Sequence, residues 1–172
     1  MKSLPFAAFV LSLGGCIASG PALLPTYEIT VPFDAVQAAK QMEEGLNSIR
    51  GNAFMRQKGG GVVTCAGQTV RLVPATNYAK QRFFALFGTF EGGVNNERKN
   101  YRFVPDAPDY YTNTKTTKCD SQGNFTFERV ADGEFYVTTI VAWQAGNSPQ
   151  GGGIMQKVSV RGAQNQSIVM AP

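Results

Sequence analysis

The chain has 172 residues, a net charge of +4 and no histidine, and only 16% of its residues are charged. This length allows one domain with a hydrophobic core plus appendages. The low charged fraction favours an all-β protein outside the cytoplasm over a helical cytosolic enzyme, and the modest, dispersed positive charge gives no support to nucleic-acid binding. The missing histidine removes the usual general base of nucleophilic triads and the commonest ligand of catalytic zinc.

The N-terminus carries the most specific signal. A short basic start, Met1-Lys2, precedes the apolar run Leu4–Leu13, which is too short to span a bilayer but suits a signal-peptide core. The run ends in Leu13-Gly14-Gly15-Cys16, which resembles the bacterial lipobox. The resemblance implies a signal peptide of residues 1–15, cleavage before Cys16 and acyl chains that hold the mature protein at a membrane. A plain secretory signal with a chance cysteine is the alternative.

Ile17 follows the cysteine, in place of the aspartate that commonly retains such lipoproteins at the inner membrane. We therefore expect the protein at the outer membrane, facing the periplasm. Once Cys16 is set aside, Cys65 and Cys119 remain, and an even remainder in an oxidising compartment favours a disulfide between them. A metal pair or redox thiols are the alternative, although no CxxC spacing supports them.

Residues 16–48 are expected to form a lipidated tether with one short helix. The segment 27–31 alternates apolar and polar residues, which predicts a short strand. Asp34 is suited to cap a helix over residues 35–44, and Gly45 is suited to end it.

The main domain is expected over residues 49–172. Residues 49–56 are predicted as a strand, the glycine run 59–61 as a hairpin loop, and 69–74 as a second strand with Arg71 facing outward. The glycine run lacks the spacing of a phosphate-binding loop.

The most regular pattern lies in Gln122–Trp143. Phe125 and Phe127 alternate with polar residues, as in a half-buried strand. Asp132-Gly133 tolerates positive φ, which predicts a tight hairpin turn. The strand from Phe135 is apolar on both sides, which favours a central place in a sheet. Further along, 144–153 is expected to be a loop, and 154–160 and 166–170 are expected to form a closing hairpin.

Four short motifs occur in a fixed order: Ile49-x-Gly51, then 66–74, then 122–127, then 132–137. This set resembles the carboxypeptidase regulatory-like domain, a transthyretin-like β-sandwich. The resemblance implies a mainly-β fold, a seven-stranded transthyretin- or Ig-like sandwich. The residue patterns add one or two short helices, at about 35–44 and 78–87. The resemblance also implies an accessory or interaction module without catalytic residues, metal or cofactor, because the family's zinc site belongs to a separate peptidase domain.

Residues 76–118 depart from this pattern and form a long insertion. Its first part has apolar residues at helical spacing over 78–87, with Asn77 as a plausible cap and Gly88 as the end. Its second part gathers aromatic and cationic side chains that could bind sugars or anionic groups. These candidate binding residues are Tyr101, Phe103, Tyr110, Tyr111, Arg98 and Arg102. The alternative is that the rings merely fasten the insertion to the sandwich.

No catalytic site is expected. Asp106, Asp109 and Asp120 are the carboxylates considered, and no partner base accompanies them. Carboxylate pairs alone can hydrolyse glycosides, but that chemistry usually needs a larger cleft than this domain offers.

The leading hypothesis is a non-catalytic, lipid-anchored envelope protein that docks on another protein in the periplasm. The first alternative is a glycan- or peptidoglycan-binding module that uses the aromatic insertion. The second is a secretion-system outer-membrane lipoprotein, because the lipoprotein of type VI secretion also uses a transthyretin-like sandwich, which is an analogy of architecture alone. The expected partners are thus a membrane, through Cys16, and an unidentified protein or glycan, but no nucleic acid.

Overall fold

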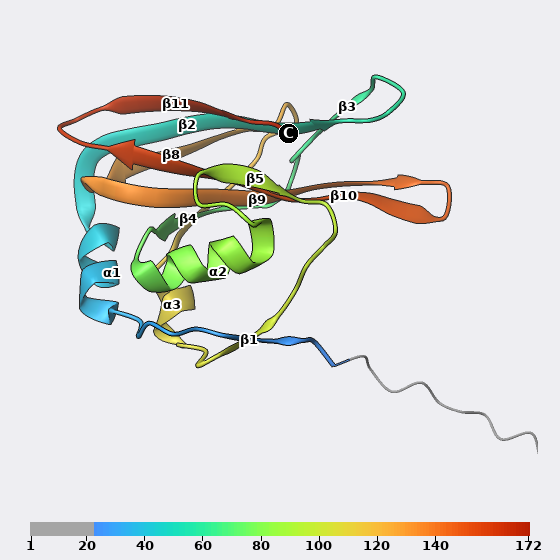
Figure 1. The fold of residues 1–172 in the computed structure, drawn as a ribbon. Helices are drawn as coiled ribbons and strands as arrows, with labels where there is room; N and C mark the ends of the chain where they lie inside the picture. Colours follow the sequence, from blue (N-terminus) through green and yellow to red (C-terminus); the bar gives the residue numbers. More distant parts are fainter. Residues whose placement is uncertain (1–22) are drawn as a thin grey trace, which may run out of the picture.

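The structure is a computed structural model that describes residues 23–172. The predicted signal peptide and Cys16 lie outside the described residues. Two β-sheets stack face to face, and a helix covers the outer side of one of them (Figure 1). The elements in chain order are β1 (Thr26–Glu28), α1 (Ala35–Met42), β2 (Glu44–Arg56), β3 (Val62–Thr64), β4 (Thr69–Pro74), α2 (Asn77–Phe87), β5 (Gly92–Asn95), β6 (Arg102–Val104), α3 (Asp109–Thr112), β7 (Lys115–Lys118), β8 (Asn124–Val130), β9 (Gly133–Ala145), β10 (Ser148–Val160) and β11 (Asn165–Met170).

The predicted mainly-β sandwich is confirmed. One sheet has five strands in the order β5-β10-β9-β4-β7, and the other has four, with β2 between β11 on one side and β8 and β3 on the other. The main core lies between the sheets, where the inward residues of β9, Phe135, Val137 and Val141, are fully buried. Within residues 23–172, no helix is long and apolar enough to cross a membrane.

Seven strands remain when the additions to the sandwich are set aside. The strand β1 comes from the predicted tether, and β5, β6 and β7 come from the predicted insertion 76–118. The small parallel pair β1–β6 joins these two segments on the far side of α2. The insertion is therefore folded structure that adds two strands, β5 and β7, to opposite edges of the five-stranded sheet.

The prediction that Gln122–Trp143 is a hairpin is wrong. Strand β8 pairs with β2 in one sheet, whereas β9 pairs with β10 and β4 in the other. The Asp132-Gly133 turn therefore carries the chain across the sandwich. The buried Asn47 amide donates hydrogen bonds of 2.9 Å to the Val130 carbonyl and to the Asp132 carboxylate, and it thereby stabilises this crossing. The same bond, with one from the Gly162 N–H, lowers the pKa of Asp132. The predicted central position of β9 is confirmed.

The predictions for the C-terminal strands also need correction. Residues 144–153 are not a loop: β9 and β10 form one long hairpin in which Ala145 faces Ser148, and its tip projects beyond the sheet (Figure 1). Nor do the last two strands form a hairpin, because β11 pairs parallel with β2. The first half of β10 was not predicted because it contains Gly151, Gly152 and Gly153, and glycine weakens the sequence pattern of a strand. At Gly152 a Cβ would lie 2.2 Å from the Asn95 carbonyl oxygen, so close approach of β5 requires glycine there.

The two predicted helices are present with shifted ends. Asp34 caps α1 by accepting the Gln37 N–H, as predicted, but α1 ends at Met42 and β2 begins at Glu44. Gly45 thus lies in a strand, where a Cβ would be 2.2 Å from the Val130 carbonyl oxygen.

The cap of α2 differs from the prediction by one residue. Thr76, not Asn77, accepts a hydrogen bond from the Ala79 N–H. Gly88 ends the helix in the left-handed conformation, as predicted. The short helix α3 was not predicted.

Candidate functional site

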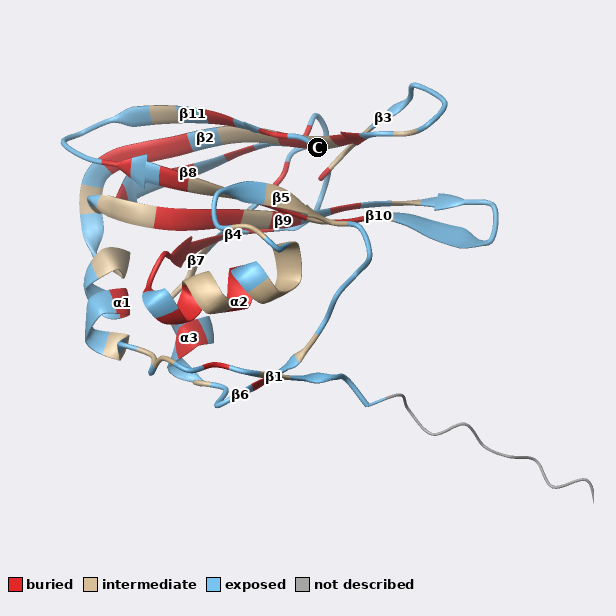
Figure 2. Ribbon diagram, in the orientation of Figure 1, coloured by how far each residue is buried: buried red, intermediate tan, exposed pale blue. Residues whose placement is uncertain are grey.

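The insertion folds back over the outer face of the five-stranded sheet. Tyr136 points outward from β9 and stacks on Phe83 of α2, with ring centroids 4.3 Å apart. Figure 2 shows buried residues on the strands and on α2 where the two meet. This contact builds a second apolar cluster, made of Ile29, Val73, Ala75, Tyr78, Ala79, Phe83, Phe103, Tyr110, Tyr136 and Met155. The helix covers only part of the face, and the uncovered part forms a groove.

The groove has a volume of about 870 Å³, which lies within the range of small-molecule sites. The sheet supplies its floor, α2 and α3 supply one wall, and the connection from β5 to β6 supplies a rim. Its lining residues are Gln68, Thr69, Arg71, Val73, Arg82, Phe83, Leu86, Phe87, Asn95, Arg98, Lys99, Asn100, Tyr110, Tyr111, Thr114, Thr116, Thr138, Thr139, Ile140, Ala142, Gly152 and Gly153.

The floor follows from the two-residue period of the strands. Arg71 of β4 lies between Thr116 of β7 and Thr138 of β9 in the register of the sheet. Val70 and Leu72 point the other way and are fully buried, so the predicted outward direction of Arg71 is confirmed. Neighbouring strands thus present hydroxyl, guanidinium and hydroxyl groups in one row.

The aromatic part of the insertion surrounds an arginine. Arg82 of α2 is only 6% exposed. Its guanidinium carbon lies 4.0 Å from the centroid of the Phe103 ring and 4.5 Å from that of the Tyr110 ring. Such contacts stabilise a cation through the ring quadrupole. The rings of the insertion are therefore organised around a cation of the protein itself.

The polar partners of Arg82 complete this arrangement. The guanidinium donates to the hydroxyls of Tyr78 and Tyr111, at 3.2 and 2.6 Å, and forms an ion pair with Asp106. Burial works against the charge, but the Asp106 bond and the tyrosine oxygens outweigh it and raise the pKa of Arg82. The group stays charged at every physiological pH.

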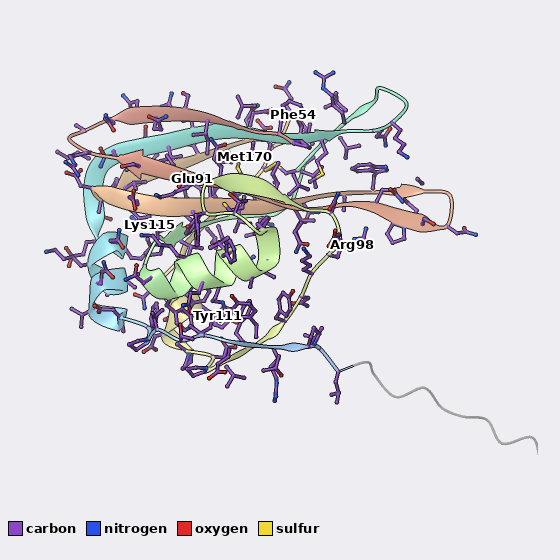
Figure 3. The ribbon with its side chains drawn as sticks, viewed as in Figure 1. Phe54, Glu91, Arg98, Tyr111, Lys115 and Met170 are labelled. Carbon is purple, nitrogen blue, oxygen red and sulfur yellow. A yellow bond between two sulfur atoms is a disulfide. The ribbon has the colours of Figure 1, made fainter. Side chains whose placement is uncertain are left out.

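Tyr111 differs from the other rings because it is 54% exposed. Its hydroxyl is held between Arg82 and Asp106. Burial, partly offset by Arg82, raises the pKa of Tyr111, so the hydroxyl remains protonated at neutral pH. The ring is fixed at one end while its remaining surface faces solvent at the groove, beside α2 (Figure 3).

Three of the predicted binding residues line the groove: Arg98, Tyr110 and Tyr111. Arg98 lies on the connection from β5 to β6 and is labelled with Tyr111 in Figure 3. Tyr110 is almost completely buried, so it contributes little surface to a ligand.

The other three predicted residues lie outside the lining of the groove. Phe103 is buried against Arg82. Tyr101 packs on Tyr27, with centroids 5.6 Å apart, and Arg102 donates to the Thr26 hydroxyl at 3.2 Å. The contacts of Tyr101 and Arg102 fasten the insertion to the N-terminal segment, which is a different attachment from the contact with the sandwich named in the alternative.

Sequence reasoning missed the floor of the groove. Thr116, Thr138 and Ile140 occupy outward positions of strands, which the period of two reveals. Nothing in the local pattern reveals that the insertion folds over that same face, because this packing depends on contacts between distant residues such as Tyr136 and Phe83.

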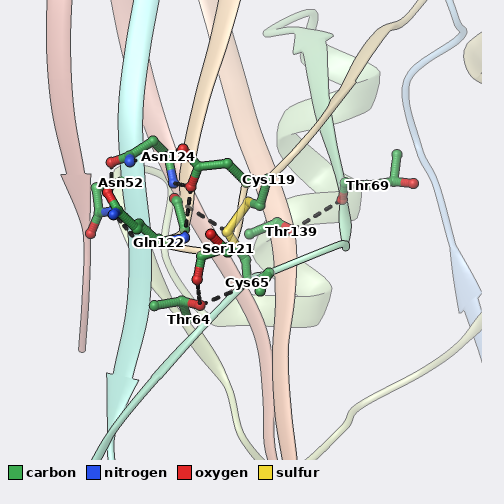
Figure 4. The surroundings of a disulfide bond; sticks show 12 residues. Asn52, Thr64, Cys65, Thr69, Cys119, Ser121, Gln122, Asn124 and Thr139 are labelled. Atoms are coloured by element: carbon green, nitrogen blue, oxygen red, sulfur yellow. Dashed lines mark hydrogen bonds between the residues drawn. A yellow bond between two sulfur atoms is a disulfide. The ribbon is translucent and has the colours of Figure 1, made fainter.

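The disulfide Cys65–Cys119 is present, with Cα atoms 5.8 Å apart. It joins the segment before β4 to the end of β7, next to hydrogen-bonded turns (Figure 4). The Cys119 N–H also donates to the Gln68 carbonyl at 3.0 Å. The bridge therefore fixes the edge strand that carries Thr116.

None of the three carboxylates weighed as catalytic residues, Asp106, Asp109 and Asp120, is among the residues that line the groove. Asp106 pairs with Arg82. Asp120 accepts the Gln122 and Asn124 N–H groups at 2.8 Å in a turn, and hydrogen bonds from Asn124 lower its pKa. Asp109 is exposed at the start of α3. Over residues 23–172, no three His, Cys, Asp or Glu residues are close enough to hold a metal ion.

No protein-family model matches the sequence, and no curated protein matches it. Among solved structures, the chain is similar to a "putative carbohydrate binding protein" from Pseudomonas aeruginosa, with a TM-score of 0.65 and 24% sequence identity. The similarity covers 81% of this chain and 97% of that chain. The two chains share a fold. At this low identity the similarity extends to the fold and not to a ligand.

Proposed function

We propose that the protein is a non-catalytic carbohydrate-binding module that holds a glycan in the groove between the insertion and the five-stranded sheet. The observation that carries this proposal is the composition of the groove, where hydroxyl and amide side chains lie beside exposed ring and aliphatic surface. The described lining contains no carboxylate and no histidine that could act as a general acid or base.

The chemistry of the lining suits a sugar. Thr116 on the floor and Asn95 on the rim offer donors and acceptors for sugar hydroxyls. The Thr138 hydroxyl donates to the Ile154 carbonyl and offers a sugar an acceptor. Ile140, which is 53% exposed, and Tyr111 offer apolar surface for the C–H faces of a pyranose. A groove of about 870 Å³ is large enough to hold several atoms of each of a few sugar units.

The similar Pseudomonas aeruginosa structure supports this proposal, because that protein is named for carbohydrate binding. Protein docking, the leading hypothesis from the sequence, is supported less. The projecting tip of the β9–β10 hairpin is exposed, but it does not indicate which protein would bind there. The secretion-system hypothesis has no observation in its favour beyond the sandwich architecture.

We also propose that a lipid on Cys16 holds this module at the outer membrane, facing the periplasm. The support is the lipobox-like Leu13-Gly14-Gly15-Cys16 and the absence of aspartate after it. Such an anchor would keep a glycan-binding groove close to envelope polysaccharides, including peptidoglycan.

The Tyr111→Ala variant is expected to weaken glycan binding up to about tenfold, because loss of a stacking ring costs about 0.5–1.5 kcal/mol and about 1.4 kcal/mol is tenfold in Kd. The full mature chain would first be screened on a glycan array, and the best oligosaccharide would then be measured by isothermal titration calorimetry. Phe90→Ala is the matched control, since Phe90 is 45% exposed and lies outside the groove. No glycan bound by the unaltered protein, or equal loss in both variants, would refute the proposal.

The Cys16→Ala variant is expected to move from the membrane fraction to the soluble periplasmic fraction when expressed in a Gram-negative host. Loss of the acyl chains removes the anchoring free energy of about 0.8 kcal/mol per buried CH₂. Fractionation with immunoblotting measures the change, and metabolic labelling with a palmitate analogue measures the lipid itself. Labelling by the palmitate analogue that persists in the variant would contradict lipidation at this residue.

A further inference from the structure

The charged residues that line the groove are all cationic. Its lining includes the four cationic residues Arg71, Arg82, Arg98 and Lys99, and no aspartate or glutamate among the described lining residues. A neutral sugar requires no such bias, because hydroxyls and amides satisfy its hydrogen bonds. A concave site lined by one sign of charge concentrates ligands of the opposite sign.

Two of these cations remain available to a ligand. Arg82 is neutralised by Asp106, and Lys99 lies 3.2 Å from Glu97, an exposed pair. Arg71 and Arg98 have no carboxylate within 4.0 Å among residues 23–172. The free charge thus sits on the floor and on the rim of the same groove.

Of the two arginines, Arg71 is the better placed to bind an anionic group of a ligand. It lies on a strand paired on both sides, and its register neighbours Thr116 and Thr138 both carry hydroxyls. A guanidinium offers two parallel N–H donors to a carboxylate, sulfate or phosphate, and the Thr116 hydroxyl can donate to the same oxygens. The Thr138 hydroxyl donates to the Ile154 carbonyl at 3.0 Å, so Thr138 shapes the floor beside Arg71 without donating to the anion.

Arg98 is carried by an ordered turn. The Asn95 side chain accepts the Lys99 N–H and donates to the Lys99 carbonyl, both at 2.8 Å, and Asn95 itself packs against Gly152 of β10. Arg98 adopts the left-handed conformation in this turn, with φ of 53°. A ligand that bridges floor and rim would therefore meet a cation at each side.

We infer that the groove selects acidic glycans, with the anionic group of one sugar unit held by Arg71 and a second acidic unit close to Arg98. This inference rests on the proposed function and adds the ligand class. The recognised chemistry is a planar or tetrahedral oxyanion on a sugar, and a carboxylate is the form that a guanidinium fork matches best.

The test compares glycans that differ only in charge. Hexagalacturonate and its fully methyl-esterified form have one skeleton, with carboxylates in the first and neutral esters in the second. A κ-carrageenan hexasaccharide and its desulfated form make the same comparison for sulfate. We expect hexagalacturonate to bind the full mature chain at least tenfold tighter than its ester, and its affinity to fall as salt rises from low to physiological concentration.

The Arg71→Gln variant is expected to lose this preference. Its affinity for the methyl ester should stay within twofold of the unaltered protein, while its affinity for hexagalacturonate should fall about tenfold. Arg50→Gln is the matched control, because Arg50 is an exposed strand arginine on the other sheet and lies outside the groove. Thermal unfolding confirms that both variants fold.

The outcomes separate the two proposals. Equal binding of the acidic and neutral forms in both pairs, or a preference that persists in Arg71→Gln, overturns the acidic-glycan inference and leaves glycan binding in place. A preference for the sulfated carrageenan over its desulfated form, with equal binding of hexagalacturonate and its ester, keeps the inference and identifies sulfate as the anion. Binding of none of the four hexasaccharides, together with no signal on the glycan array, refutes both.

Discussion

The double substitution Cys65→Ser and Cys119→Ser is expected to lower the free energy of unfolding by about 4 kcal/mol. The disulfide closes a segment with a sequence separation of 54 residues, and the chain-entropy model gives this magnitude for a loop of that length. Both cysteines are buried, so the added serine hydroxyls contribute to the loss. Urea unfolding followed through the fluorescence of Trp143, the sole tryptophan, measures the change.

The double substitution should also weaken glycan binding by the fraction of protein that remains folded. The closed segment contains β4, α2, β5, β6, α3 and β7, which supply the wall, the rim and part of the floor of the groove. Dithiothreitol is the control reagent: it should destabilise the unaltered protein and leave the double variant unchanged. An effect of the double substitution below about 1 kcal/mol would contradict the structural role assigned to this bridge.

The Arg82→Met variant is expected to lose about 3 kcal/mol of unfolding free energy. Methionine keeps much of the side-chain volume but removes the ion pair, the hydrogen bonds to Tyr78 and Tyr111, and the cation–π contacts. Loss of charged hydrogen bonds at a buried arginine accounts for this magnitude, with a discount for the exposed partner Asp106. Chemical denaturation measures it.

Two further variants locate the source of this effect. Arg82→Lys keeps the charge but not the planar fork, so it should recover less than half of the loss. Arg50→Met removes an exposed arginine that lies 3.7 Å from Glu128, and it should cost below about 0.5 kcal/mol. If Arg82→Met proved as mild as Arg50→Met, Arg82 would not organise the insertion.

The fold class could be predicted because the buried strands alternate clearly. Phe125 and Phe127 are buried while Thr126 and Glu128, which alternate with them, are exposed. Arg71 likewise points outward where the pattern places it. Helix ends were predictable where a cap has a clear chemical signature, as at Asp34 and Gly88.

Strand partners could not be predicted from the same local signals. The Asp132-Gly133 turn has the residues of a hairpin, yet hydrogen bonds from Asn47, far away in sequence, place it between the two sheets. The glycines of β10 have a low strand propensity, and pairing along the whole of β9 overrides it.

The groove could be predicted only in part. The aromatic and cationic content of the insertion pointed to the correct segment, and Tyr111 and Arg98 do line the groove. Which rings are buried depends on the position of Arg82, a residue that carries no special signal in the sequence. Most floor residues, such as Arg71, Thr138 and Ile140, belong to β4 and β9, outside the insertion, and their place beneath it follows from the tertiary contacts.

The arginine at the centre of the aromatic residues has a consequence for the kinds of ligand that the insertion can accept. Rings grouped around a cation are the usual receptor for quaternary ammonium groups such as choline or methylated lysine. Here Arg82 acts as a tethered competitor, because its covalent attachment gives it an effective concentration that a free amine does not match. Displacing it would leave Asp106 without its ion pair. Amine ligands are therefore excluded from the aromatic residues around Arg82. Of these residues, Tyr111 alone has an exposed ring surface, and that surface can contact a ligand without positive charge.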